Sequence, residues 1–214
     1  MPRQNRVTPS GEIMATSARG TLLGNRGCLH DEYQHIRRTY QLQRWIICRL
    51  EFKGRRHIIM TPGHYTELFF LDEATALAAG HRPCAECSRD RFNEFRSVWA
   101  QANADLGVKA RPLATTIDAI LHQERIDASG RKITYPDRLA ALPDGVFVQR
   151  SDDPTAWLVL GDRLLAWSPF GYAQRTPRPS GETTVAVLTP RSIVRALAAG
   201  YRTGIHPSAS HSAT

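Results

Sequence analysis

Two cysteines separated by two residues, Cys84 and Cys87, place the strongest constraint on how this chain folds. Thiolates at that spacing lie on one tight turn and bind a single tetrahedral ion, which fixes the backbone on both sides. Pro83 restricts the backbone entering this turn, and a helix predicted to follow offers N–H groups to the sulfurs. The C-x-x-C spacing therefore predicts half of a metal site, with Zn²⁺ as the ion.

A redox pair and unpaired thiols are the alternatives for this motif. A thioredoxin-like C-x-x-C directly follows a β-strand in a βαβ unit. In this chain residues 74–79 are strong helix formers, and Gly80 is typical of the position that follows a helix. A helix is therefore expected before the cysteines, which favours metal binding over redox chemistry.

Two cysteines do not complete a zinc site, so two more ligands are needed. Cys28 and His30 are the first choice, because a C-x-H pair in a glycine-rich segment can turn both side chains to one side. Cys48 is the weaker candidate, since it shares one face of a predicted strand with Ile46, Leu50 and Phe52 and is typical of a buried structural cysteine. The predicted ligands are Cys28, His30, Cys84 and Cys87, with His57 and His64 as alternatives to His30.

Positive charge is concentrated in the first quarter of the chain. Residues 1–60 hold eleven Lys and Arg against four Asp and Glu, a net charge of +7, whereas the whole chain of 214 residues carries +8. This asymmetry favours a polyanionic partner, nucleic acid first and DNA before RNA. A solvated basic face is the alternative. The residues predicted to contact phosphates are Arg19, Arg26, Arg37, Arg38, Arg55 and Arg56.

The remaining composition is that of an ordinary globular protein, with 42% hydrophobic and 22% charged residues. A run of about 18 apolar residues, the minimum for a membrane span, is missing, so no membrane partner is expected. The first residues are polar and unlike a secretory signal. We therefore expect a bacterial-type cytoplasmic protein, in which cysteines serve metal or redox chemistry before disulfides.

The periodicity predicts an α+β fold: an N-terminal β-hairpin and helix module that binds zinc, packed with a small antiparallel sheet and helices. Residues 1–31 are expected to form an irregular arm, and residues 44–52 and 57–60 a hairpin. The predicted domains are 1–105 (basic arm and zinc module), 106–141 (helical connector), 142–207 (a β-meander with a C-terminal helix) and a disordered tail, 208–214.

Residues 69–87 resemble the second half of the Ada-type metal-binding domain. In that family a short strand, an acid-capped Ala-rich helix and G-[aromatic]-R-P-C-x-x-C precede a helix, and this chain matches in order and spacing from Phe69 to Cys87. The resemblance implies that Cys84 and Cys87 bind zinc. Ada repair proteins also use an earlier C-x-x-x-C, one cysteine of which accepts methyl groups from DNA phosphotriesters. This chain has no such pair, so the methyl-acceptor activity is not implied.

The leading hypothesis is a zinc protein that binds nucleic acid, in DNA repair or regulation, through its basic N-terminal region. One alternative is a metal-dependent hydrolase or nuclease, for which His30, Asp31, Glu32 and His35 are further possible ligands. Another is a zinc-stabilised protein-interaction module. No catalytic residue is identified, and the pattern favours a binding protein over an enzyme. Phosphate-cradling glycine motifs and G-x-S-x-G are absent.

Overall fold

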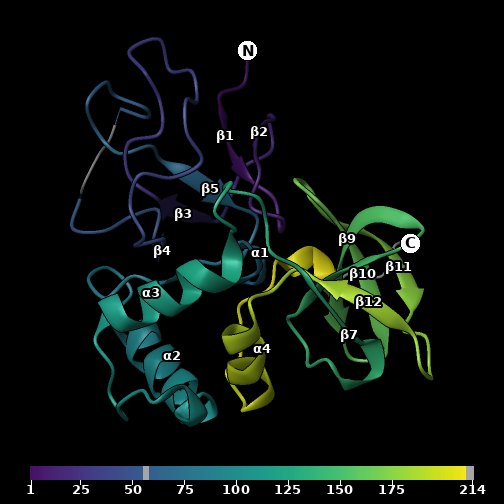
Figure 1. The fold of residues 1–214 in the computed structure, drawn as a ribbon. Helices are drawn as coiled ribbons and strands as arrows, with labels where there is room; N and C mark the ends of the chain where they lie inside the picture. Colours follow the sequence, from purple (N-terminus) through teal and green to yellow (C-terminus); the bar gives the residue numbers. More distant parts are fainter. Residues whose placement is uncertain (55–57, 211–214) are drawn as a thin grey trace.

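The computed structural model describes residues 1–54 and 58–210. Over these ranges the chain is an α+β protein with two six-stranded sheets and four α-helices (Figure 1). This agrees with the predicted fold class. Within the described residues, no helix is both long and apolar enough to cross a lipid bilayer.

The first sheet is mixed and is built almost entirely from the N-terminal third of the chain. Its strands, in spatial order, are β2 (Ile13–Ala15), β1 (Gln4–Val7), β5 (Leu68–Phe70), β3 (Leu22–Asn25), β4 (Ile46–Cys48) and β6 (Arg82–Pro83). The expected irregular arm is therefore wrong, because β1, β2 and β3 lie within it. The expected hairpin is wrong as well: β4 pairs with β3 and β6, residues 58–60 form no strand, and His57 lies outside the described residues.

The second sheet is antiparallel and contains the predicted meander. Consecutive strands β8, β9 and β10 pair as neighbours, whereas β11 and β7 were not predicted. The strands, in spatial order, are β11 (Gly171–Pro177), β10 (Arg163–Ser168), β9 (Asp153–Leu160), β8 (Phe147–Arg150), β12 (Thr184–Val187) and β7 (Tyr135–Arg138).

The four α-helices are α1 (Glu73–Ala78), α2 (Arg89–Ala102), α3 (Ala114–Arg125) and α4 (Arg191–Ala198). They are the helices expected before and after the C-x-x-C, in the connector and near the C-terminus. Asp72 caps α1 as its side chain accepts a hydrogen bond from the Thr75 amide at 2.8 Å. Three short 3₁₀ helices accompany them: η1 (Ala104–Leu106), η2 (Leu139–Ala141) and η3 (Pro207–Ala209).

Helix α1 lies between the two sheets and connects them (Figure 1). Its capping residue Asp72 accepts a hydrogen bond from the Tyr172 hydroxyl at 2.7 Å, which ties α1 to β11. Glu73 accepts one from the Tyr201 hydroxyl at 2.6 Å, which ties it to the segment after α4. One hydrophobic core extends from the first sheet through α2 and α3 to α4 and the second sheet.

The first residues of the expected disordered tail are packed against the body of the protein. Ala209 is buried, and the Ser208 hydroxyl accepts a hydrogen bond from the Tyr172 amide at 2.9 Å. Residues 208–210 thus belong to the folded part of the chain, whereas residues 211–214 lie outside the described residues.

Candidate metal centre

Parallel pairing of β4 with β6 brings the third cysteine to the C-x-x-C. The register sets Ile46 opposite Arg82 and Ile47 opposite Pro83, so Cys48 and Cys84 come next on the two strands. The Ile47 carbonyl accepts a hydrogen bond from the Cys84 amide at 2.9 Å. Pro83 is tolerated because the ladder uses the amides of the residues on either side of it.

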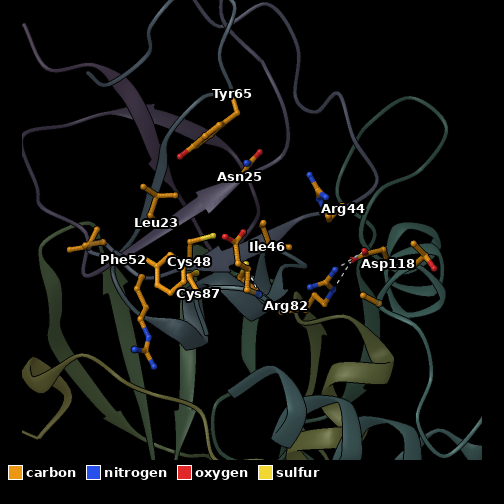
Figure 2. Close-up of a pocket in the computed structure, with 17 residues that line it drawn as sticks. Leu23, Asn25, Arg44, Ile46, Cys48, Phe52, Tyr65, Arg82, Cys87 and Asp118 are labelled. Atoms are coloured by element: carbon orange, nitrogen blue, oxygen red, sulfur yellow. Dashed lines mark hydrogen bonds and ion pairs between the residues drawn. The ribbon is translucent and has the colours of Figure 1, made fainter. Parts of the chain in front are cut away.

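Cys48, Cys84 and Cys87 form a cluster of three thiols. Their sulfur atoms all lie within 4.8 Å of one another, and this is a group with the composition and spacing to hold a metal ion. Cys84 and Cys87 are buried, Cys48 is half-buried, and Ile46 and Phe52 pack against the cluster. Figure 2 shows Cys48 and Cys87 at the centre of the residues that line the adjoining pocket.

The backbone supports a thiolate at Cys84. The Glu86 amide donates a hydrogen bond to Cys84 Sγ at 3.4 Å, and Ser88 Oγ lies 3.8 Å from Cys87 Sγ. Hydrogen bonds from Cys48 and then Cys87 lower the pKa of the Cys84 thiol, whereas the hydrogen bond to Cys84 raises the pKa of Cys48. Because metal ligation requires deprotonated thiols, thiols that donate to a neighbouring sulfur in this way are suited to bind a cation in place of their protons.

A pocket of about 400 Å³ opens beside the three sulfurs. Asn25 and Tyr65 lie across it from the cysteines, and the ion pair of Arg82 with Asp118 lies to one side (Figure 2). Arg44, Arg49 and Glu86 also line the pocket, and all three are exposed, so the two arginines outnumber the one carboxylate. The candidate metal centre therefore borders a cavity with a basic rim.

Cys28 and His30, the first-choice partners from the sequence, do not join Cys84 and Cys87. His30 is buried, with Nδ1 2.6 Å from Thr66 Oγ1 and Nε2 3.2 Å from the Thr61 carbonyl oxygen. The Cys28 thiol contacts the His30 carbonyl oxygen at 3.6 Å. Both ring nitrogens of His30 are thus engaged in holding the 60–66 segment against the loop after β3.

The other proposed ligands lie apart from the cluster or outside the described residues. His64 is exposed, and His57 is not described. Asp31 accepts hydrogen bonds from the Tyr33 and His35 amides and from the Arg37 side chain. Its carboxylate therefore stabilises the turn at residues 31–37. In the described part of the chain, the three cysteines are the one group of His, Cys, Asp or Glu with metal-site spacing.

The order of elements around the C-x-x-C differs from the prediction in one respect. The short strand β6 stands between α1 and Cys84, so a strand does precede the motif. The sequence argument against a redox pair is therefore weaker than expected. Cys48 supplies a different argument: a redox pair needs two thiols, whereas a third thiol in contact with both is a feature of metal binding.

The predicted phosphate-binding arginines do not share one environment. Arg26 is 1% exposed and is wrong as a surface contact, because its guanidinium is enclosed by Gly11, Thr39, Trp45 and His81. Arg19 and Arg38 are exposed. Arg37 is exposed and paired with Asp31 at 2.7 Å. Arg55 and Arg56 lie outside the described residues.

In comparisons with protein-family models, curated proteins and solved structures, nothing matches this chain. The resemblance of residues 69–87 to the Ada-type domain therefore stays a prediction. The main evidence for function is therefore the geometry of Cys48, Cys84 and Cys87.

Proposed function

We propose that this protein binds Zn²⁺ through Cys48, Cys84 and Cys87 and uses the zinc-stabilised face of its first sheet to bind nucleic acid. The observation that carries the metal proposal is the approach of the three sulfurs to within 4.8 Å of one another. They come from two segments that are far apart in the sequence, so their meeting is a property of the fold.

Zinc is the ion that suits this donor set. Three thiolates are soft ligands, and Zn–S bonds of about 2.3 Å at tetrahedral angles hold sulfurs about 3.8 Å apart. The sulfurs already lie within 4.8 Å of one another, so they would have to approach by about 1 Å at most to reach that value. When bound, zinc supplies cross-linking and a fourth position for another ligand. Cys48, Cys84 and Cys87 would hold it, and β4 would thereby be fastened to the start of α2.

The nucleic-acid part of the proposal rests on charge beside this centre. Arg44 and Arg49 are exposed and line the same pocket as the cysteines. Arg82 also lines it, but Asp118 neutralises it, and the exposed Glu86 offsets one of the two arginines, so the pocket lining keeps a net positive charge. Exposed guanidinium groups that have solvent on one side and a fixed sheet on the other are suited to phosphate contacts. Arg19 and Arg38 add exposed positive charge from the same third of the chain.

Metal content tests the zinc centre directly. Purified wild-type protein is expected to contain one zinc per chain, and Cys48→Ser and Cys84→Ser are expected to lose it. Cys28→Ser is the matched control and should retain zinc, as should His30→Ala. Zinc loss from Cys28→Ser with retention in Cys48→Ser would overturn this ligand set. A Cys84–Cys87 disulfide in freshly purified, metal-free protein would favour redox chemistry instead.

Binding to a short DNA duplex at several salt concentrations tests the second part. Affinity should fall steeply with salt because phosphate contacts release counterions. Arg44→Gln and Arg49→Gln should each weaken binding and reduce the salt slope by about 1. Arg163→Gln, at an exposed position on β10 of the other sheet, is the control for net charge. Equal effects of all three variants, or no binding of DNA or RNA at low salt, would contradict the proposal.

A metal-dependent hydrolase is the second candidate, and one observation favours it. The described residues supply three ligands and no fourth, and a 400 Å³ pocket adjoins the cluster. Zinc with three protein ligands activates water in hydrolases. Cobalt-substituted protein separates the two roles: a spectrum altered by azide indicates an open position, whereas an unaltered four-coordinate spectrum indicates a closed structural site. His57→Ala tests whether that side chain closes it.

A further inference from the structure

A second site lies away from the cysteines, where three basic side chains surround a pocket of about 260 Å³. Arg26 follows β3, Arg125 ends α3, and Lys132 lies in the loop after α3. The charged residues that line this pocket are Glu12, Arg26, Arg125, Arg131 and Lys132, four of them basic and one acidic. None of them belongs to the proposed metal centre or its basic rim.

Arg26 is the most enclosed of these cations, with 1% of its surface exposed. Its Nε donates to His81 Nε2 at 3.1 Å and its Nη1 to the Gly11 carbonyl at 3.0 Å. Its guanidinium carbon lies 3.9 Å from the centre of the Trp45 ring. The second terminal nitrogen, Nη2, is buried and has no hydrogen-bond partner in the described part of the chain. A buried guanidinium nitrogen without an acceptor is costly unless a ligand supplies one.

Arg125 stands beside the same Trp45 ring, 4.1 Å from its centre, and is fully buried. It donates to the carbonyls of Gly80 at 2.9 Å and Gln43 at 2.5 Å, and its Nε has no partner. The Lys132 ammonium donates to the Ala78 carbonyl. These acceptors are neutral carbonyl oxygens at the end of α1 and before β4, so they supply dipoles and no full negative charge.

Among the residues that the structure describes, no carboxylate neutralises the three cations. The charge of Asp118 raises the pKa of Arg125 from a longer distance, but both carboxylate oxygens of Asp118 accept hydrogen bonds from Arg82. Asp127 pairs with the exposed Arg131, and Glu12 is exposed at the rim. Burial, followed by repulsion from Arg26 and Arg125, lowers the pKa of Lys132 to about 7. Burial lowers the pKa of Arg125 to about 9 and that of Arg26 well below its usual range.

We propose that this pocket binds a phosphate group, either as inorganic phosphate or on a small molecule. Guanidinium groups match the tetrahedral oxygens of phosphate, and its double negative charge offsets more of the cluster than a carboxylate would. Ser10 and Thr39 line the pocket and can add hydroxyl donors. At about 260 Å³ the cavity is smaller than typical sites for drug-sized ligands, which fits a phosphate with at most a small substituent.

Calorimetric titration of the full chain with inorganic phosphate, at constant ionic strength in chloride, tests this site. Wild type is expected to bind one phosphate saturably. Lys132→Met keeps the aliphatic stem but removes the ammonium and should weaken binding at least tenfold. Lys109→Met, at an exposed position outside the pocket, removes a lysine ammonium elsewhere on the protein and should bind as wild type does. Equal weakening in both variants, or no binding by wild type, would overturn the proposal.

A second measurement needs no variant. Lys132 is one of three lysines in the chain, with Lys53 and Lys109. Acetic anhydride at pH 7.5 modifies neutral amines, and peptide mass spectrometry reports each lysine separately. Phosphate should protect Lys132 and leave the other two unchanged. To identify the source of the phosphate, glycerol phosphate and ribose phosphate are compared with inorganic phosphate: stronger protection by either indicates a small organic phosphate. Absence of protection by all three contradicts the site.

Discussion

Arg82 and Asp118 form a bidentate ion pair inside the protein, with Nε to Oδ1 at 2.9 Å and Nη2 to Oδ2 at 2.8 Å. Their side chains are 2% and 6% exposed. Arg82 lies in β6, two residues before Cys84, and Asp118 lies in α3. The pair therefore fastens the strand that carries the candidate metal centre to a helix of the core.

Removing one partner of this pair is expected to be strongly destabilising. Asp118→Ala leaves the Arg82 guanidinium buried without its counter-charge, which should lower the free energy of unfolding by about 3–5 kcal/mol. Asp105→Ala, which removes the exposed partner of Arg195, is the control and should cost at most about 1 kcal/mol. Urea denaturation of the three proteins measures the difference. Similar midpoints for both variants would mean that the pair contributes little.

The hydroxyl of Tyr201 is a second buried connection whose removal can be predicted. It donates to Glu73 at 2.6 Å, and burial with the nearby Glu73 charge raises the pKa of Tyr201. Tyr201→Phe leaves a carboxylate oxygen without this donor and should lower the free energy of unfolding by about 1–3 kcal/mol. Tyr33→Phe, at a position 70% exposed, should have no measurable effect. Thermal unfolding provides the comparison, and an unchanged midpoint for Tyr201→Phe would contradict the prediction.

Local patterns predicted the helices well because their signals lie within a few residues. Asp72 before an Ala-rich run and Gly80 after it mark both ends of α1, and both perform those roles. The strands of the first sheet were harder to predict. Gly24 suggests a turn, yet it lies in β3, where an added Cβ would come within 2.4 Å of the Phe70 ring. Glycine is present there for close packing between β3 and β5, which no local pattern reveals.

Cys48, the third cysteine of the candidate metal centre, also could not be assigned from local patterns alone. The alternation of Ile46 with Cys48 predicted correctly that they share a face, and both pack against Cys84 and Cys87. The parallel pairing of β4 with β6 joins residues more than 30 positions apart, so the sequence alone did not connect Cys48 to the C-x-x-C. The sequence likewise predicted that Arg26 is a surface residue. Arg26 is enclosed by Trp45 and His81, which lie far from it in the sequence, so no local pattern reveals its burial.

The lowered pKa of Lys132 predicts a specific pH dependence of stability. Its pKa is about 7 in the folded chain, because of burial and then of Arg26, against an ordinary value of 10.5. Between these values the unfolded chain binds the proton and the folded chain does not, so stability rises with pH, by at most about 1.4 kcal/mol per pH unit. Below about pH 7 both states are protonated and this dependence ends.

Lys132→Met should remove that slope. Urea denaturation at pH 7, 8 and 9 in phosphate-free buffer should show the free energy of unfolding of wild type rising relative to that of the variant as pH rises, since wild type gains stability and the variant does not. Lys109→Met, at an exposed position, should keep the wild-type slope. Parallel pH profiles for wild type and Lys132→Met would show that the Lys132 ammonium is not perturbed.

Two glycines in the same sequence context offer a test of packing at the end of α1. Gly80 and Gly200 each end a helix with positive φ, 90° and 101°, and each helix closes with the same two hydrogen bonds from the glycine and the next amide. The surroundings differ. A Cβ at Gly80 would lie 2.6 Å from Arg125 Cδ, whereas none of the described residues has an atom within 4 Å of one at Gly200.

Gly200→Ala should therefore cost only the left-handed backbone strain of a non-glycine residue, about 1 kcal/mol. Gly80→Ala carries that strain and also displaces Arg125, which should add about 1–3 kcal/mol. Since Arg125 lines the proposed phosphate pocket, Gly80→Ala should also weaken phosphate binding, and Gly200→Ala should not. Urea denaturation and calorimetry of the two variants measure both effects. Equal losses of stability would mean that Arg125 moves aside freely, and unchanged phosphate affinity in Gly80→Ala would mean that its position does not matter for the ligand.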